Sequence, residues 1–226
     1  MREIILDTET TGLNSSSGDR IVEIGCIELL NQVPTGNFFH TYVNPERDMP
    51  EEAFAIHGLS AEFLLDKPKF KNIVDGFLEF IGDAPLVIHN AEFDLRFIDS
   101  ELLLLEKEPI ERSRSVDTVK IARSRYPGAQ VSLDALCRRF EIDLSRRDKH
   151  GALLDAELLA EVYLYLMGGR QRGLDLNSDL SKLEQNQFSQ DDLPVRLVRP
   201  HLPSAEELDE HEALLDQIKG PVWRTE

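Results

Sequence analysis

Apolar positions in the first part of the chain recur in short runs that predict three consecutive β-strands. Residues 2–8, 20–30 and 36–43 are rich in isoleucine, valine, leucine and aromatic side chains, and turn-like segments at 12–19 and 31–35 separate them. Runs of this length with β-branched and aromatic residues are typical of strands. The sheet is therefore expected to begin as an antiparallel meander.

After this meander the spacing of the apolar residues changes to one that favours helices. Between residues 70 and 82 the apolar side chains lie three or four positions apart, as on one face of an α-helix, and residues 85–89 read as a brief buried strand. Further helices are expected at 91–107, 117–126, 132–140 and 151–167. Antiparallel strands followed by alternating strands and helices predict an α/β fold, with a mixed sheet covered by helices.

The glycine pair at 168–169 ends this pattern and predicts three parts in the chain. Residues 1–168 form the folded domain, and residues 169–200 are polar and weakly patterned, which indicates a flexible linker. Residues 201–226 are expected to contain a short helix that docks on a partner.

This C-terminal helix has a clear start signal. Ser204 and Glu207 have the spacing of a capping box, and Leu208, Leu215 and Ile218 follow on one helical face. Gly220-Pro221 supplies a stop. A short amphipathic helix with nothing nearby to pack on is more typical of a docking element than of a second domain.

The charge of the chain argues against a protein that binds nucleic acid tightly on its own. Its 226 residues include 42 acidic and 25 basic side chains, a formal net charge of −17, and affinity for polyphosphate comes largely from cations. The basic residues are concentrated in 112–149, which holds ten of them against five acids. Nucleic acid is expected to approach along that stretch.

Cysteine content and hydropathy indicate a cytoplasmic protein without a membrane partner. Cys26 and Cys137 lie far apart in apolar surroundings with no metal-like spacing, so they are expected to be reduced, buried thiols. The N-terminal apolar run is short and flanked by acids, and no run approaches eighteen apolar residues. Neither a signal peptide nor a membrane span is expected.

Asp7 and Glu9 are the first candidates for chemistry. Residues two apart in a strand point to the same side, so these carboxylates are expected close together at a strand end. Such a pair repels unless one member is protonated or a cation lies between them. An isolated pair is more often a solvent-facing feature before a turn, but the apolar run before it resembles a central strand.

The other candidates lie where a strand meets a helix and where a later helix starts. Asn90 is a natural N-cap, and Asp94 would lie in the first helical turn. An acid at this position can also serve only to compensate the helix dipole, which is the alternative explanation for Asp94. His150 and Asp155 are five residues apart, about 140° on a helix, so they converge only if His150 lies in the preceding loop. Residues 146–149 predict a solvent-accessible, cationic loop.

Four carboxylates and one histidine at such junctions predict metal-assisted phosphodiester hydrolysis. Oxygen-rich sites usually hold hard divalent ions. Two ions roughly 3.5–4 Å apart clamp the attacking and leaving oxygens of a phosphodiester, and a histidine can then deprotonate water.

The motifs resemble those of the DEDD exonuclease superfamily, in the subclass with histidine as general base. They read Asp7-x-Glu9-Thr-x-Gly12, His89-Asn90-x-x-Phe93-Asp94 and His150-x4-Asp155, in this order and spacing. The resemblance covers residues 1–168. It implies a ribonuclease H-like fold, a mixed five-stranded sheet flanked by helices, followed here by a flexible C-terminal tail.

The resemblance also implies the roles of individual residues. Two Mg²⁺ or Mn²⁺ ions would be held by Asp7, Glu9, Asp94 and Asp155, and His150 would activate water for 3′→5′ release of nucleoside monophosphates. The terminal nucleotide would be bound by Asp7, Glu9, Thr10, Leu13, His57, Asn90, Phe93 and Asp155. Leu13 would act as a wedge against the last base, although ordinary packing is the alternative for Leu13 and Phe93.

Partners are implied by the tail. Residues 205–216 and Trp223-Arg224 resemble the polymerase-binding tail of bacterial proofreading subunits, so 201–226 would bind the polymerase catalytic (alpha) subunit, with a small third core subunit as a further partner. Gln171, Leu174 and Leu176 resemble the short signals by which replication proteins bind the sliding clamp. A chance pattern in the linker explains these residues equally well.

The leading hypothesis is a proofreading 3′→5′ exonuclease of a bacterial replicative DNA polymerase, acting on single-stranded or frayed 3′ DNA ends. A stand-alone DEDD-type 3′→5′ exoribonuclease is the nearest alternative, because the same carboxylates can cut either polymer. A non-catalytic replisome adaptor is a third hypothesis, which five intact catalytic positions disfavour.

Overall fold

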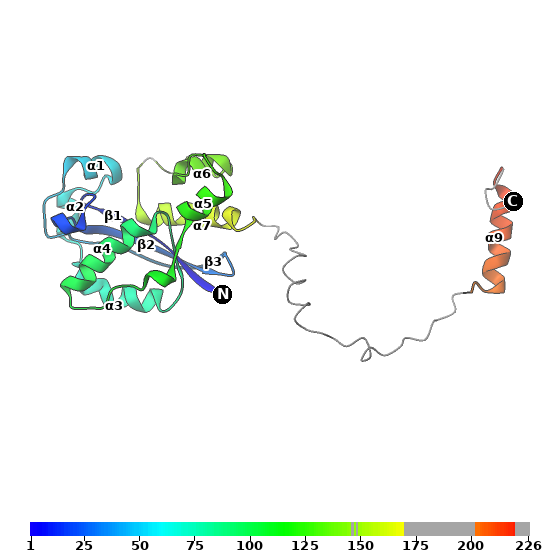
Figure 1. Cartoon of the computed structure of the whole chain (residues 1–226), viewed down its shortest axis with the longest axis horizontal. Coiled ribbons are helices and arrows are strands. Elements are labelled where there is room, and N and C mark those ends of the chain that lie inside the picture. The colour runs from blue at the N-terminus through cyan, green and yellow to red at the C-terminus, as the bar shows by residue number, and fades with distance from the viewer. Residues whose placement is uncertain (146, 148, 170–201, 220–226) are drawn as a thin grey trace. The chain divides into compact units, whose positions relative to one another are not determined.

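The structure is a computed structural model that describes residues 1–145, 147, 149–169 and 202–219. The chain divides into two units, Met1–Gly173 and Leu174–Glu226, and each is considered by itself. Figure 1 shows the sheet and most of the helices in the first unit, and a single labelled helix in the second. The predicted linker lies, beyond Gly169, outside the described residues.

A mixed five-stranded sheet forms the centre of the first unit, as predicted. Its order is β3-β2-β1-β4-β5. The strands are β1 (Arg2–Thr10), β2 (Ile21–Leu30), β3 (Val33–Tyr42), β4 (Leu86–Ile88) and β5 (Ser115–Asp117). Strand β1 pairs antiparallel with β2 and parallel with β4. It is therefore the central strand, and the carboxylates at its end lie in the middle of the sheet rather than at an edge.

The hairpin between β2 and β3 is tighter than predicted. Asn31 and Gln32 both have positive φ, 53° and 68°, and strand β3 begins at Val33. A two-residue turn with both φ angles positive matches the twist of the flanking strands. The prediction of a loop through residue 35 is therefore wrong, because an asparagine and a glutamine complete the turn.

Helices follow the predicted order, with slightly shorter bounds. They are α1 (Glu51–His57), α2 (Ala61–Leu65), α3 (Phe70–Ile81), α4 (Ala91–Leu104), α5 (Thr118–Arg125), α6 (Leu133–Arg139) and α7 (Ala152–Leu166), with 3-10 turns η1 (Ser15–Ser17) and η2 (Arg112–Arg114). Helices α1 and α2 and strand β5 are absent from the sequence-based prediction. Each has too few buried apolar residues for a repeat to stand out, with Ala53 in α1, Leu64 in α2 and none in β5.

Alternation along β1 divides the core into two layers. Ile4 and Leu6 pack in one buried cluster with residues of α3 and α4, whereas Ile5 belongs to a second cluster with residues of α5, α6 and α7. Successive side chains of a strand point to opposite faces. Both faces of the sheet are therefore covered by helices, which Figure 1 shows.

Gly25 lets the start of α7 approach the sheet. A Cβ atom at Gly25 would lie 2.4 Å from the backbone carbon of Ala152, the first residue of α7. No side chain fits in that space, because real Cβ contacts are longer. Gly25 is opposite Asp7 in the β1–β2 register, so this close approach brings the first turn of α7 beside the acidic end of β1.

The described part of the second unit is α9 (Ala205–Gln217). Its predicted capping box is confirmed, because the Ser204 side chain accepts from the Glu207 amide and the Glu207 side chain accepts from the Ser204 amide. Leu208 and Ile218 are exposed, and Leu215 is buried. The predicted Gly220-Pro221 stop and Trp223-Arg224 lie outside the described residues.

Two predictions about the chain as a whole can be compared with the structure. Cys26 and Cys137 are both free and buried, as their apolar surroundings predict. No helix in the described ranges is long and apolar enough to span a bilayer.

Candidate active site

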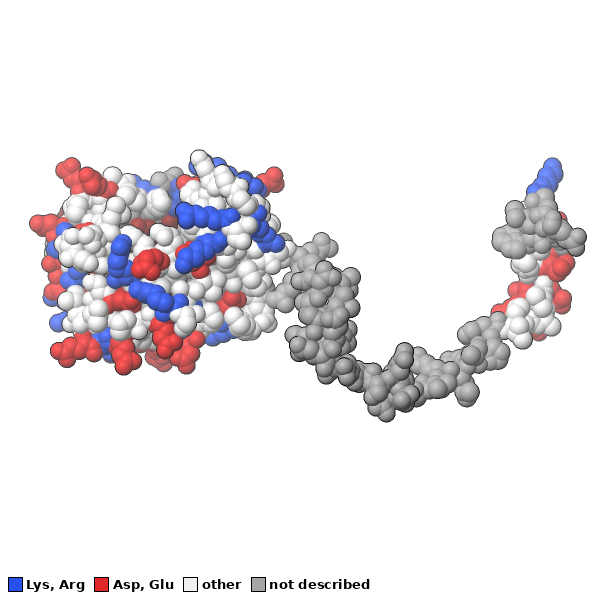
Figure 2. Space-filling view, in the orientation of Figure 1, with Lys and Arg blue, Asp and Glu red and all other residues white. Residues whose placement is uncertain are grey.

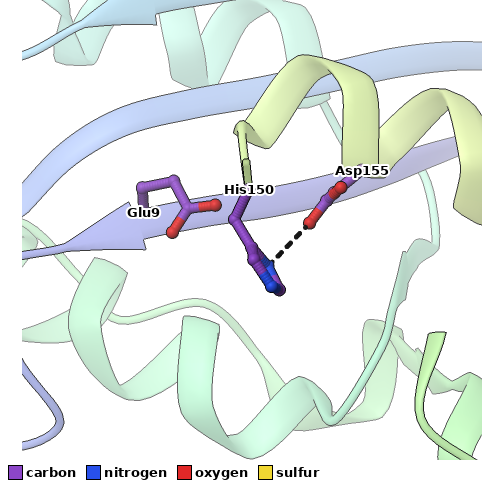
Figure 3. A group of neighbouring side chains, drawn as sticks. All are labelled: Glu9, His150 and Asp155. Atoms are coloured by element: carbon purple, nitrogen blue, oxygen red, sulfur yellow. Dashed lines mark ion pairs between the residues drawn. The ribbon is translucent and has the colours of Figure 1, made fainter. Parts of the chain in front are cut away.

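Three strand and helix termini bring the predicted site residues together. Strand β1 carries Asp7 and Glu9, α4 carries Asp94 and α7 carries Asp155. One ligand atom each from Glu9, His150 and Asp155 lie within 4.8 Å of one another. Figure 3 shows Glu9 on its strand facing the His150 ring, which is on the segment that leads into the helix of Asp155.

Thr8 holds Asp94 against β1. The Thr8 amide and hydroxyl both donate to Asp94 Oδ1, at 3.0 and 2.7 Å. Burial raises the pKa of Asp94 to about 7, although these donors act in the opposite direction. Compensation of the helix dipole is therefore an incomplete explanation for Asp94, because its carboxylate is buried and bonded to the strand that carries Asp7 and Glu9.

Asn90 occupies the N-cap position of α4 but does not cap the helix with its side chain. Its φ is 69°, in the left-handed region, and it makes no side-chain capping hydrogen bond. The predicted N-cap position is confirmed, whereas the hydrogen bond that an N-cap side chain usually accepts is absent for Asn90. Asparagine tolerates this backbone conformation, and the exposed Asn90 side chain lines a cavity beside the acids instead.

The charges of Asp7 and Glu9 are only partly compensated, since Arg147 lowers the pKa of Glu9 without forming an ion pair with it. Burial raises the pKa of Asp7 well above its ordinary value, and repulsion from Asp94, Glu9 and Asp155 adds to the effect. Burial and the charge of Asp155 raise the pKa of Glu9 to about 8. Within the described ranges no Lys or Arg forms an ion pair with Asp7 or Glu9.

This donor set fits a divalent cation. Crowded, buried carboxylates must either take up protons or share a cation. Carboxylate oxygens with one imidazole suit hard or borderline ions such as Mg²⁺ and Mn²⁺. The site therefore has the chemistry and the unmet charge of a metal centre.

Asp155 is the exception among the acids. Burial would raise its pKa, but hydrogen bonds and charges from Arg147 and His150 outweigh burial and lower the pKa. The Arg147 guanidinium donates through Nε to Oδ1 at 2.6 Å and through Nη2 to Oδ2 at 2.7 Å. Asp155 is therefore the carboxylate that stays ionised most readily.

His150 lies in the loop before α7, the arrangement that convergence with Asp155 requires. Its side chain is 49% exposed, and Nδ1 is 3.2 Å from Asp155 Oδ2. Arg147 Nη2 lies 2.9 Å from the same nitrogen. The two contacts are alternatives, because Nδ1 cannot donate to the carboxylate and accept from the guanidinium at once.

The predicted solvent-accessible loop is only partly correct. Lys149 is exposed, but the Arg147 side chain is only 8% exposed. Its guanidinium is drawn inward by Asp155 and by Asp134 of α6, to which Nη1 donates. Arg146 and Asp148 lie outside the described residues.

Two cavities flank the acids and divide the predicted substrate residues between them. One, of about 590 Å³, is lined by Glu9 together with Thr10, Leu13, His57 and Phe93. The other, of about 610 Å³, is lined by Asp7, Asn90, Arg147, His150 and Asp155. Asn90 therefore lines the second cavity, together with the candidate substrate residues Asp7 and Asp155, and not the cavity of Leu13, His57 and Phe93.

Three side chains of the first cavity have distinct surroundings. Leu13 is 76% exposed and does not pack in the core. Phe93 packs on Phe97, with ring centroids 5.0 Å apart. His57 Nδ1 accepts from the Leu59 amide, and Nε2 is buried without a partner among the described residues. Burial lowers the His57 pKa, which favours the neutral ring.

Thr8, Glu23 and Arg147 are absent from the sequence-based site. Glu23 is buried opposite Glu9 in the β1–β2 register and lies 2.7 Å from His40 Nε2. An acid inside an apolar strand was a usable signal for Glu23. Nothing local marks Thr8 or Arg147, because their partners are distant in the sequence.

Comparisons with known proteins agree on one family. The family model described as "Exonuclease" matches residues 4–163. The chain is 52% identical over 224 residues to the DNA polymerase III subunit epsilon of Rickettsia conorii, which covers 96% of each protein. It is 43% identical over 236 residues to the protein of the same name from Escherichia coli, with 99% of this chain and 97% of that protein covered.

Solved structures give the same fold. Exonuclease X, in complex with 5′ overhanging duplex DNA, has a TM-score of 0.58 at 28% identity, covering 73% of this chain and 90% of that one. The nuclease domain of 3′hExo, a DEDDh family member bound to rAMP, has a TM-score of 0.64 at 17% identity over 76% and 94% of the two chains. The second likeness concerns the fold alone.

The raised pKa of Glu9 predicts a pH-dependent gain in stability for Glu9→Gln in the metal-free protein. The Glu9 pKa is about 8 in the folded protein, whereas the ordinary pKa of a glutamate is 4.5. Between these values the folded state keeps a proton that the unfolded state has released, so the wild-type free energy of unfolding falls as pH rises. Glutamine removes this dependence and should stabilise the protein by on the order of 1–3 kcal/mol at pH 8.

Thermal unfolding in a chelating buffer at pH 5 and pH 8 measures this effect, which should be the larger at pH 8. Glu28→Gln is the matched control with the opposite sign, because hydrogen bonds from Arg2 and Asn37 lower the Glu28 pKa to about 2. An equal gain from Glu9→Gln at both pH values would contradict the assignment.

Proposed function

The chain belongs to the exonuclease family and, within it, to the DNA polymerase III epsilon subunits, and from this premise we propose how its site proofreads DNA. It is a metal-dependent 3′→5′ exonuclease that removes mispaired 3′-terminal nucleotides from DNA. The observation that carries the site assignment is the convergence of Glu9, His150 and Asp155 within 4.8 Å, beside two further buried acids.

Asp7, Glu9, Asp94 and Asp155 are the residues that would hold two Mg²⁺ or Mn²⁺ ions. The raised pKa values of Asp7 and Glu9 support this assignment, because acids whose charged form is disfavoured are stabilised by a bound cation. Ions bound there would stabilise the charge that develops on the phosphate and lower the pKa of water. Thr8 keeps Asp94 turned toward this centre.

His150 is the general base. When its Nδ1 donates to Asp155 Oδ2, Nε2 carries the free lone pair and takes a proton from the attacking water. The water oxygen bonds to phosphorus as the bond from phosphorus to the 3′ oxygen of the preceding nucleotide breaks. The products are a nucleoside 5′-monophosphate and a strand with a new 3′ hydroxyl.

The cavity of about 590 Å³ beside Glu9 is the terminal-nucleotide pocket. Leu13, which has no packing role in the core, is placed to act as the wedge against the last base. His57 Nε2 offers an unpaired donor, and Phe93 offers an apolar wall. Thr10 lines the same cavity, while Asn90 would contact the substrate from the second cavity, which Asp7 and Asp155 also line.

The names of the relatives favour DNA over RNA as the substrate. Relatives that are 43–52% identical over nearly their whole length carry the epsilon-subunit name. The fold alone does not discriminate between sugars, since one structural neighbour contains rAMP. A non-catalytic adaptor is disfavoured because all four acids and His150 are present and three of them converge.

The Asp7→Ala/Glu9→Ala variant is expected to lose exonuclease activity by roughly three orders of magnitude or more. Both substitutions remove candidate metal ligands without removing core packing. Release of nucleoside 5′-monophosphates from 3′-mispaired DNA and from matched single-stranded RNA, each with Mg²⁺, measures activity and sugar preference together. Asp75→Ala/Glu79→Ala, which removes two exposed acids of α3, is the control and should be fully active.

Residual metal-dependent cleavage by the purified Asp7→Ala/Glu9→Ala variant would contradict the site assignment. Faster cleavage of RNA than of DNA by the wild type would transfer support to the ribonuclease alternative.

Residues 201–226 would bind the polymerase catalytic (alpha) subunit. Helix α9 is capped independently of other elements, and residues 201–216 contain six acids and no Lys or Arg. Such a face suits a basic partner surface. The same resemblance supports a complex that also contains a small third subunit.

Deletion of 201–226 is expected to remove polymerase binding and to leave hydrolysis of a free oligonucleotide unchanged. The catalytic residues all lie in the first unit, so chemistry and docking should separate. Gel filtration of the truncated protein with the polymerase subunit measures the first effect, and its rate on single-stranded DNA is the internal control. Co-elution of the truncated protein with the polymerase would refute this role for the tail.

The segment 171–176 would bind the sliding clamp, although it lies outside the described residues. Its Gln171, Leu174 and Leu176 have the spacing of a clamp signal. The Gln171→Ala/Leu174→Ala variant should therefore lose most of its binding in a pull-down with the clamp. Retention equal to that of the wild type would show that the pattern arose by chance.

A further inference from the structure

Arg147 has the densest set of ionic contacts at the site. Its guanidinium forms two hydrogen bonds with the Asp155 carboxylate, donates to Asp134 and lies 2.9 Å from His150 Nδ1. The side chain is only 8% exposed. In the described part of the chain, it is the only Lys or Arg that forms an ion pair with one of the four candidate metal ligands.

The contact with Asp155 is a two-point one, which fixes orientation as well as charge. Nε and Nη2 bond to different carboxylate oxygens, at 2.6 and 2.7 Å. Paired parallel hydrogen bonds of this kind hold the plane of a carboxylate. Oδ2 also lies near His150 Nδ1, but Oδ1 keeps a second lone pair, so Asp155 can be held by Arg147 and still serve as a ligand.

Arg147 also fastens the loop that carries His150. Asp134 lies in the first turn of α6 and Asp155 in the first turn of α7, so one guanidinium ties the loop to two helices. The His150 side chain is itself 49% exposed, and its backbone amide makes a long contact of 3.3 Å with the Ile56 carbonyl. The position of His150 therefore depends strongly on the residue three positions before it.

We propose that Arg147 is a positioning residue of the exonuclease, which orients Asp155 and anchors the His150 loop without contacting the substrate. This inference rests on the proposed roles of Asp155 and His150. It predicts that loss of Arg147 lowers kcat, because the reacting groups are misplaced, and leaves KM for DNA nearly unchanged.

A direct role in holding the DNA phosphate is the competing explanation. Arg147 lines the cavity of about 610 Å³, and arginine is well suited to phosphate. However, Nε, Nη1 and Nη2 each already have a protein partner, and the side chain offers little exposed surface. A phosphate contact would appear as a raised KM, which separates the two explanations.

Steady-state cleavage of a single-stranded oligonucleotide by the full-length chain tests the proposal. Arg147→Met keeps the bulk of the side chain without its donors, and Arg147→Lys keeps the charge without the two-point geometry. Both should lower kcat roughly ten- to hundredfold, with KM within about twofold of the wild type. Arg138→Met is the matched control, since Arg138 also pairs with Asp134 but is 71% exposed, and its kcat should be unchanged.

Thermal unfolding of the metal-free proteins provides a readout that is independent of activity. Arg147→Met should lower Tm by several degrees, because it leaves the buried Asp155 carboxylate without its partner. In an Asp155→Asn background the same substitution should have much less effect, since the charge to be compensated is gone.

The outcomes separate the inference from the function on which it rests. Unchanged kcat in Arg147→Met, a raised KM at constant kcat, or equal losses of Tm with and without Asp155→Asn would each overturn the positioning role. A wild-type protein without exonuclease activity would instead refute the proposed function, and the unfolding comparison would still report whether Arg147 and Asp155 are coupled.

Discussion

Burial of several carboxylates together at the end of the central strand is the constraint on which the rest of the site depends. Asp7, Glu9, Asp94 and Asp155 are gathered where burial disfavours their charge, and the raised pKa values of the first three record that cost. Neighbouring groups offset part of this cost, because Thr8 donates a hydrogen bond to Asp94 and Arg147 donates one to Asp155. The remaining charge is what suits the site to divalent cations.

The fold supplies the close approaches that this concentration of charge needs. Strand β1 is central, so its last residues are bordered by β2 on one side and by the end of β4, which leads into α4, on the other. Gly25 lets the first turn of α7 lie against β2. Helix α7 can then bring Asp155 and the preceding His150 to the same place, next to the two cavities that the acids line.

Basic and acidic side chains are unevenly distributed over the surface of the first unit. In the view of Figure 2, Lys and Arg side chains gather over the region of α5 and α6, whereas acids are prominent around the edges of the first unit. Lys120 and Arg123 of α5 line the cavity that contains His150. A net charge of −17 is thus compatible with a nuclease that meets DNA over a limited basic region and relies on partners for residence.

The sequence by itself determined the α/β class, the mixed sheet, most element positions, the capped helix α9 and the five candidate catalytic residues, because periodicity, capping and motif spacing are local properties. Tertiary structure decided that the Arg147 side chain is buried, that the Asn90 side chain lines a cavity without forming a capping hydrogen bond, and that Thr8 bonds to Asp94. These features depend on partners brought together only by the folded sheet. The local sequence determines which side chains a segment carries, and the packing of distant segments determines which charged groups each side chain contacts.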